Sequence, residues 1–261
     1  MRLGEAGRWI VTRLQWVLPL LVLVALWEAA VRLFDIAPYI LPAPSRVAAR
    51  LYEDAGLLFH HGLITALEIV LGLAVGVGAG VGTAMLMAMT RLAERLAWPL
   101  VVATQALPVF AIAPLLVLWF GFGLGSKIVM AALIIFFPVV SATHDGLTRT
   151  DQGLIDIARL VQAPRLRVLW LLRLPAALPA MASGIRIAAA IAPIGAVVGE
   201  WVGASAGLGY LMLHANARLQ TDLVFAALVI LALIAILVRS IAGYLTRRMI
   251  PWAEERDIHV I

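Results

Sequence analysis

The first pattern in the chain with residue types suited to catalysis is a serine hydrolase motif. Gly203-Ala204-Ser205-Ala206-Gly207 matches G-x-S-x-G, and His214 follows shortly after it. In hydrolases this motif occupies a tight strand-to-helix turn, with an acid partner and an oxyanion hole. Here it follows a long apolar run. We therefore favour a glycine-rich turn between two helices, and keep an intramembrane hydrolase as the less favoured alternative.

Nucleotide and metal sites have weaker support. Gly78 and Gly80 lie in an apolar stretch that lacks the preceding strand of a dinucleotide-binding motif, and no G-x-x-x-x-G-K-[ST] sequence occurs. The adjacent His60 and His61 do not share a helix face, and we expect them in an outer loop. His144 stands alone. We therefore predict no catalytic residue, no metal site and no cofactor bound by this chain.

Composition indicates the solvent in which the chain folds. Hydrophobic residues make up 63% of its 261 residues and charged residues 13%, against roughly 45–50% and 25% in soluble domains. This number of charged residues is too small to cover a water-exposed surface. Lipid must therefore surround most of the chain. The absence of cysteine excludes disulfides and thiolate metal sites.

Apolar runs of spanning length predict an all-α polytopic membrane protein. A spanning helix needs about 20 mostly apolar residues. This criterion predicts about six transmembrane helices. Their ranges are 14–33, 64–89, 98–120, 127–143, 176–200 and 222–244. The domain organisation is then an N-terminal segment 1–13, a transmembrane domain 14–244 with an inner loop at about 144–175, and a tail 245–261.

The distribution of basic residues predicts the orientation. With the N-terminus inside, the inner connections carry Arg2, Arg8, Arg13, Arg91, Arg95, Arg149, Arg159, Arg165, Arg167, Arg173, Arg239, Arg247, Arg248 and Arg256. The outer connections carry only Arg32, Arg46, Arg50, Lys127 and Arg218. By the positive-inside rule, both termini of this multi-pass protein are expected in the cytoplasm.

Glycine and proline within the predicted spans indicate close packing and irregular backbone. Gly72, Gly76, Gly78, Gly80 and Gly82 in the second span are typical of helix contacts through small residues. In the third and fifth spans, polar side chains accompany prolines, as expected where backbone lines a water-filled cavity. The residues predicted to line such a water-filled pathway are Gln105, Pro108, Pro114, Ser183, Pro193, Gly195 and Glu200. Kinks that serve only helix packing would give the same pattern.

Charged residues inside membrane spans are costly and need an explanation. Glu28 and Glu68 lie nearer a helix end than a centre, and we expect structural roles for them. Glu200 closes the fifth span at its outer end. Contact with a solute, contact with a protein outside the membrane and anchoring of the following loop all remain open for it.

The inner loop is too polar to span and too long for a simple turn. Leu154, Ile155, Ala158 and Val161 share one helical face, which predicts a short amphipathic helix. Pro164 is then suited to begin a second one. The residues alone favour neither a membrane-surface element nor a docking element for a soluble partner.

Resemblance to a known family favours docking. Residues 156–163, Asp-Ile-Ala-Arg-Leu-Val-Gln-Ala, followed by Leu174-Pro175, resemble the EAA loop of ATP-binding-cassette (ABC) importer permeases. Asp156 stands where glutamate is usual and Ala158 matches the second alanine. Gln162 replaces the glycine that normally permits a tight bend between two short helices. Ala163-Pro164 is expected to supply the break instead.

The likeness extends through most of the chain. The matching segments are Trp27-Glu28, residues 41–45, Leu107-Pro108, residues 113–115, residues 119–123, Gly199-Glu200 and residues 207–210. In order and spacing they resemble permeases for nitrate, sulfonates and taurine. Residues 192–196 and 212–218 look most like members that import a pyrimidine precursor of thiamine.

This resemblance implies a transport subunit rather than an enzyme, in the bacterial cytoplasmic (inner) membrane. Two permease copies, expected as a homodimer, would bind cassette ATPase subunits that use ATP, and an extracytoplasmic solute-binding protein would deliver the solute. Nucleic acid is not an expected partner. The implied ATPase-coupling residues are Asp156, Ala158, Arg159, Leu160, Val161, Gln162 and Ala163. The expected substrate is a thiamine pyrimidine precursor, with sulfonate, taurine or nitrate as alternatives.

Overall fold

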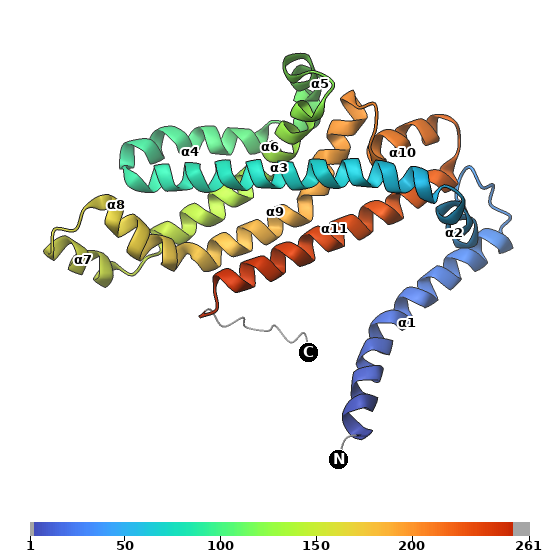
Figure 1. The fold of residues 1–261 in the computed structure, drawn as a ribbon, viewed down its shortest axis with the longest axis horizontal. Coiled ribbons are helices and arrows are strands. Elements are labelled where there is room, and N and C mark those ends of the chain that lie inside the picture. Colours follow the sequence, from blue (N-terminus) through green and yellow to red (C-terminus); the bar gives the residue numbers. More distant parts are fainter. Residues whose placement is uncertain (1–2, 253–261) are drawn as a thin grey trace. The chain divides into compact units, whose positions relative to one another are not determined.

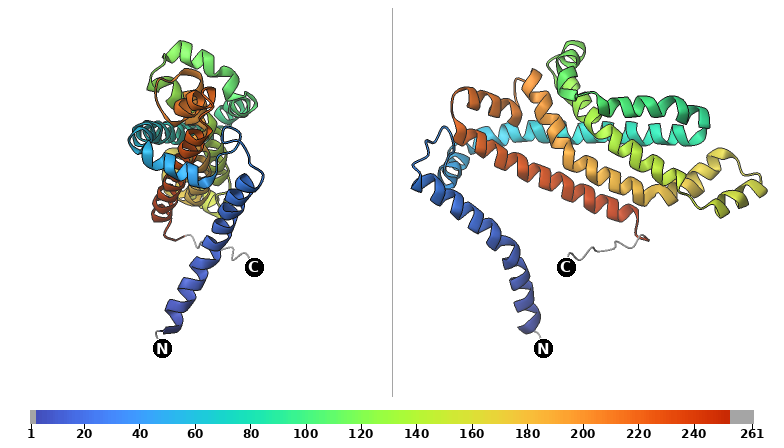
Figure 2. Two further views of the ribbon diagram at one scale, coloured as in Figure 1. Left: turned by 90° about the vertical axis from the view of Figure 1, so that its right-hand side faces the viewer. Right: turned by 180° about the vertical axis from the view of Figure 1, so that it is seen from behind.

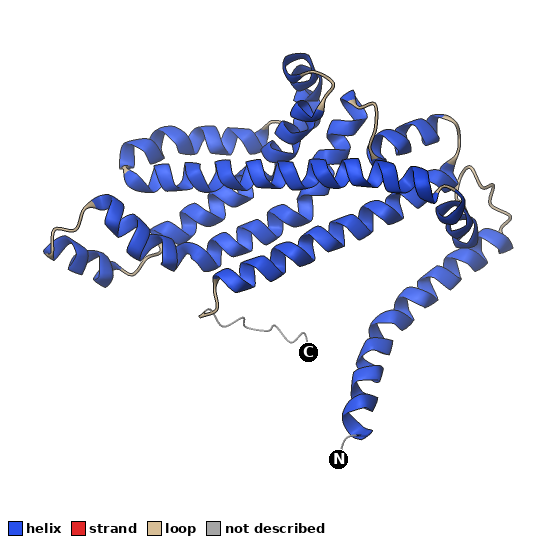
Figure 3. Cartoon of the chain, viewed as in Figure 1, coloured by secondary structure: helices blue, strands red, loops and turns tan. Residues whose placement is uncertain are grey.

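The chain is helical, with short connections, wherever the computed structural model describes it. It describes residues 3–252, with side chains from residue 18, and contains no strand among them (Figures 1 and 3). The helices are α1 (Leu3–Leu33), α2 (Pro44–Glu53), α3 (Ala55–Met89), α4 (Arg91–Ala106), α5 (Val109–Phe120), α6 (Leu124–Thr148), α7 (Gln152–Leu160), α8 (Arg165–Val168), the π-helical turn η1 (Leu169–Arg173), α9 (Leu174–Gly203), α10 (Leu208–Ala217) and α11 (Thr221–Met249).

The predicted all-α membrane fold is confirmed. Four helical segments among the described residues are long and apolar enough to cross a bilayer: α3, α6, α11 and the segment Arg165–Gly203. The bent pair α4 and α5 brings the number to five if it is one span. Helix α1 covers the first predicted span and begins within the predicted N-terminal segment, while α11 runs into the predicted tail. Residues 1–2 and 253–261 of those two segments lie outside the described residues.

The third predicted span, 98–120, is not one continuous helix. It breaks between α4 and α5, whose axes differ by 102°. Proline disfavours helical backbone at the residue before it. Accordingly Leu107 is extended, with φ −80° and ψ 121°, and Pro108 is the N-cap of α5. The dipeptide therefore ends one helix and starts another in a new direction.

The chain divides into two compact units, the first of which comprises the described residues up to Phe59 together with Leu211–Val229. Within it, Glu28 of α1 accepts hydrogen bonds from Ser45 N at 2.9 Å and Ser45 Oγ at 2.8 Å. Arg32 lies 2.5 Å from the same carboxylate. Glu28 therefore ties α1 to the start of α2, which is the structural role predicted for it.

The second unit comprises His60–Tyr210 and the described residues from Ile230 onward. Its centre is the packing of α6 against α9, which lie side by side in the views of Figure 2. One apolar cluster joins these helices to α3 and the later part of α11, and includes Ile69, Ile135, Ala188 and Val238. A second cluster, which includes Met87, Val101 and Leu147, joins α3 and α4 to the other end of α6.

Glycines let the backbones of this unit approach closely. A Cβ at Gly72 would lie 2.5 Å from Ala131 Cβ, and one at Gly80 would lie 2.8 Å from a methyl group of Val139. On the other side of α6, a Cβ at Gly195 of α9 would lie 2.6 Å from Ala131 Cα. The predicted packing through small residues is therefore present at Gly72, Gly76 and Gly80, whereas Gly78 and Gly82 have no neighbour within 4 Å of a Cβ built there.

These contacts predict that two similar substitutions on α3 differ in their effect on thermal stability. Gly72→Ala should lower thermal stability in detergent, because its Cβ collides with Ala131 and overpacking typically costs about 1–3 kcal/mol. Gly78→Ala should leave stability unchanged or raise it, because nothing lies within 4 Å of its Cβ and alanine favours the helix. Melting curves of the monodisperse protein test this. Equal destabilisation by both substitutions would contradict the packing described.

Candidate functional site

The inner loop forms the short helix α7, which begins and ends with hydrogen-bonded caps. Asp151 Oδ1 accepts from Gly153 N at 2.6 Å and Leu154 N at 3.3 Å, which satisfies two of the free amide groups at the helix start. At the end, Ala163 N donates to Ala158 O and Gln162 N to Arg159 O. This pair of bonds is a Schellman motif, in which the residue after the helix adopts left-handed backbone.

Gln162 is that left-handed residue, with φ +52°. Glycine is favoured at such a position because it has no Cβ, and the EAA-loop pattern described above has glycine here. The bend is nevertheless complete, and Pro164 follows it as the N-cap of α8. The break that Ala163-Pro164 was expected to supply is therefore preceded by a left-handed turn at Gln162 itself.

The predicted coupling residues separate into an exposed set and a buried one. Leu160 is 83% exposed and Val161 69%. Asp156 and Arg159 form an exposed ion pair at 2.9 Å. Ala158, by contrast, is buried together with Ile155, so these two residues hold α7 against the rest of its unit. The exposed tip of α7 is thus apolar, with a charged pair beside it.

The seven predicted pathway residues also separate by exposure. Gln105, Pro108, Pro114 and Ser183 are exposed, whereas Pro193, Gly195 and Glu200 are buried. Gln105 and Pro108 lie on either side of the break between α4 and α5. Gly195 packs against α6 and therefore faces another helix. The structure therefore does not gather all seven on one surface of the chain.

A buried polar cluster, which the sequence analysis did not bring together, joins α3, α6 and α9. Glu68 of α3 is 0% exposed, Glu200 of α9 is 1% and Lys127 of α6 is 5%. Lys127 Nζ lies 3.0 Å from Glu68 Oε1. Thr65 Oγ1 donates to Glu200 Oε1 at 2.6 Å, and Gly209 N donates to Glu200 Oε2. Buried charges need such partners because desolvation is costly.

The same cluster fixes the turn that follows α9. Gly207 N donates to His61 Nδ1 at 2.9 Å, and Leu208 N donates to Thr65 Oγ1 at 2.7 Å. Gly207 has φ +115°, and a Cβ there would lie 2.2 Å from Glu200 Cδ. The second glycine of the G-x-S-x-G pattern therefore makes room for the Glu200 carboxylate. Ser205 is exposed on the turn.

Two sequence-based placements are wrong here. His60 and His61 lie within α3 rather than in an outer loop, and Lys127 lies buried within α6 rather than in an outer connection. A signal for the cluster was present in the sequence. His61, Thr65 and Glu68 are spaced by four and three residues, which places them on one face of a helix.

Comparisons with known proteins identify the family. Residues 72–251 match the model of the binding-protein-dependent transport system inner membrane component. An ABC transporter permease of Haemophilus influenzae is 50% identical, over 88% of this chain and 94% of that protein. The chain belongs to this permease family.

Other relatives of this permease carry substrate names. The riboflavin permease RibX of Chloroflexus aurantiacus is 43% identical over 89% of this chain and 88% of its own. The formylaminopyrimidine permease ThiX of Halalkalibacterium halodurans is 35% identical over 90% of this chain and 94% of its own. Among solved structures, the permease of the MetNI methionine transporter shares the fold, with a TM-score of 0.60 at 18% identity over 77% of this chain and 98% of that one.

Membership decides between transport and catalysis. Permease subunits of ABC importers are not enzymes, and a separate ATPase subunit hydrolyses ATP. The hydrolase alternative therefore has no remaining support, since Gly207 of its motif is needed to make room for the Glu200 carboxylate. The resemblance inferred from the inner loop and the ordered motifs is confirmed.

The buried cluster predicts strong non-additivity between two of its members. Lys127→Met should greatly lower the thermal stability of the permease, because removing one partner of a buried ion pair costs about 3–5 kcal/mol. Glu68→Gln/Lys127→Met should recover part of that loss, because no unpaired carboxylate then remains at position 68. Melting curves in detergent for both single variants and the double variant measure the coupling. If the double variant shows the sum of the single losses, the pair does not stabilise the fold.

Proposed function

We propose that this permease moves a small solute across the cytoplasmic membrane by alternating access, driven by an ATPase that docks on α7. The observation that carries the proposal is the exposed tip of α7. Leu160 and Val161 are large apolar side chains left open beside the Asp156–Arg159 ion pair. An apolar helix end with a polar rim is the surface that a groove on a soluble partner would cover.

The helix beyond α7 is suited to transmit motion from that dock. Arg165–Gly203 is one helical segment of 39 residues, about 58 Å long at 1.5 Å per residue. It begins two residues after the α7 bend at Gln162 and Ala163, and ends just past Glu200. A displacement of α7 by the ATPase would therefore be carried through α9 to the turn that Glu200 holds.

The assembly and orientation follow from the same proposal. We place α7 and both termini in the cytoplasm, because most arginines lie on those connections. Two copies of the permease, taken as a homodimer, would enclose the pathway, and an extracytoplasmic binding protein would deliver the solute. In this arrangement Gln105 and Ser183, both exposed, are the side chains that we assign to the pathway. We assign Glu200 to anchoring the turn.

For the substrate we propose a pyrimidine precursor of thiamine. The residues assigned to the pathway are uncharged. Within the buried cluster Lys127 pairs with Glu68, and Glu200 accepts hydrogen bonds from Thr65 and Gly209, so these groups are engaged inside the chain. Such a pathway suits a neutral heteroaromatic solute better than an anion. ThiX, a relative named for formylaminopyrimidine, agrees with this choice. Riboflavin is the second candidate because RibX is 43% identical. Sulfonates and nitrate are disfavoured because they are anions, and taurine because it carries an ionised sulfonate and an ammonium group.

The docking proposal predicts that α7 variants lose the ATPase without unfolding. Asp156→Arg/Leu160→Asp should abolish co-purification of the ATPase and its stimulation by the permease, because both side chains are exposed at the proposed contact. The melting temperature of the isolated permease should change little for the same reason. Co-expression with a cassette ATPase, followed by turnover measurements in proteoliposomes, provides the readout.

Gln162→Gly is the matched control for this experiment. Glycine adopts φ +52° without a steric penalty, so the bend and the contact with the ATPase should be retained. If the double variant still binds and stimulates the ATPase, α7 is not the dock. If Gln162→Gly also abolishes coupling, the Gln162 side chain itself has a role that this proposal does not include.

The substrate proposal is tested by uptake into proteoliposomes that contain the permease, its ATPase and its binding protein. Formylaminopyrimidine should be accumulated in an ATP-dependent manner and should be displaced by unlabelled formylaminopyrimidine but not by taurine. Uptake of riboflavin alone would select the second candidate. Uptake of taurine or a sulfonate would overturn the argument from the uncharged pathway while leaving the importer function intact.

A further inference from the structure

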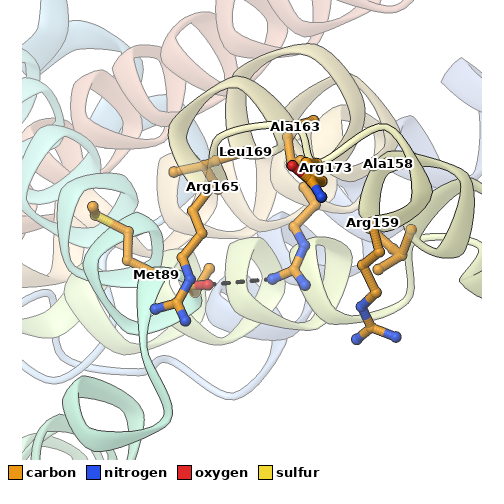
Figure 4. Close-up of a pocket in the computed structure, with 11 residues that line it drawn as sticks. Met89, Ala158, Arg159, Ala163, Arg165, Leu169 and Arg173 are labelled. Atoms are coloured by element: carbon orange, nitrogen blue, oxygen red, sulfur yellow. Dashed lines mark hydrogen bonds between the residues drawn. The ribbon is translucent and has the colours of Figure 1, made fainter.

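Two cavities lie side by side where α3 ends and α8 begins. One, of about 480 Å³, is enclosed by the end of α3, by α7 and by the segment from α8 to η1 (Figure 4). The other, of about 520 Å³, lies between the end of α3, the start of α4 and α6. Arg165 and Arg173 line both of them. The two cavities therefore share a wall of arginine side chains at the ends of two candidate spans.

The arginines of this wall have few acidic partners. Arg165, Leu169 and Arg173 recur every four residues and so lie on one helix face, and Figure 4 shows the guanidinium groups of Arg165 and Arg173 on the same side of the cavity. Arg173 Nη1 donates to Ala88 O at 3.2 Å, while its buried Nε has no hydrogen-bond partner in the described structure. No described carboxylate forms an ion pair with Arg165.

Few acidic groups lie at the cavities. Glu94 is the one carboxylate that lines either cavity among the residues described. Its Oε1 lies 3.4 Å from His144 Nε2. Arg159, the third arginine at the first cavity, is paired with Asp156. Arg165 and Arg173 thus line the cavities without an ion-pair partner among the described residues, which leaves positive charge available to an anion.

An apolar surface adjoins these donors. Leu166 and Trp170 occupy the neighbouring positions of the same helical segment and are more than half exposed. Tryptophan is favoured at the boundary between lipid chains and head groups. A small dissolved anion needs only the arginines, whereas a phospholipid would use the arginines for its phosphate and the apolar face for its chains.

We propose that Arg165 and Arg173 form a binding site for the head group of an anionic phospholipid. The phosphodiester accepts hydrogen bonds from the guanidinium groups of Arg165 and Arg173, and the acyl chains lie along Leu166 and Trp170. Basic pockets between membrane helices bind anionic head groups by the same chemistry. An acidic surface of the ATPase is the competing occupant. The lipid is favoured because the arginines lie at span ends and adjoin an exposed apolar face.

Native mass spectrometry of the full chain, purified in detergent and titrated with phosphatidylglycerol or phosphatidylcholine, tests the proposal. The wild type should bind phosphatidylglycerol several-fold more tightly. Arg165→Gln should weaken that binding about fivefold, the loss expected for one arginine near an anionic lipid. Arg167→Gln is the matched control, because it removes the same charge from an exposed residue two positions away that lines neither cavity.

Each other outcome overturns the assignment in a distinct way. Equal affinity for the two lipids would exclude an anionic head-group site. An equal loss in Arg167→Gln would indicate diffuse surface charge. Displacement of phosphatidylglycerol by 10 mM inorganic phosphate, on the order of cellular phosphate, would indicate a site for a free anion. Unchanged lipid binding in Arg165→Gln, together with lost ATPase co-purification, would assign the arginine to the protein partner.

Discussion

Backbone contact between α3, α6 and α9 is the constraint on which the rest of the second unit depends. Lipid supplies no hydrophobic force between helices, so their association relies on close packing and hydrogen bonds. Gly72 and Gly195 approach the same residue of α6, Ala131, from two sides. Any side chain larger than hydrogen at either position would push the helices apart. The close approach of the three backbones therefore determines where the polar side chains of these helices lie.

The buried cluster is a consequence of that approach. Lys127 lies one turn before Ala131 on α6, and a Cβ at Gly199 of α9 would lie 3.2 Å from Lys127 Cα. The ammonium group can then reach Glu68 on α3 while Glu200, next to Gly199, reaches Thr65. Because the members come from separate helices, separating α3 from either α6 or α9 would leave a buried charged group without its partner in a low-dielectric interior. The cluster thus makes the relative register of the helices specific.

The sequence was sufficient for the helices and for the family, but not for the contacts between helices. Composition and run length determine which segments can enter lipid, so the all-α membrane fold was predictable. The break at Leu107-Pro108 was also predictable, since proline restricts the backbone of the residue before it. The predicted span 98–120 instead assumes that this proline is tolerated within one helix. For α7, the amphipathic pattern predicted the helix but did not show that Ala158 faces inward.

The polar cluster is harder to predict because it depends on register between helices. The spacing of His61, Thr65 and Glu68 indicates a polar face on one helix but not its partner. Lys127 looked like a loop residue because it lies near the start of an apolar run, and only the depth of its packing against Gly199 shows that it is buried. Charge counting by connection therefore places such a residue wrongly whenever a helix extends beyond its apolar core.

Gln162 illustrates how a departure from a family pattern can preserve the structure that the pattern encodes. Left-handed backbone at a residue other than glycine costs about 1–2 kcal/mol, and the surrounding constraints outweigh this cost. The two Schellman hydrogen bonds satisfy the last carbonyl groups of α7, and Pro164 prevents the helix from continuing. The direction of the chain after α7 is thus determined by hydrogen bonding and by proline. Glycine at this position makes the bend easier without being what defines it.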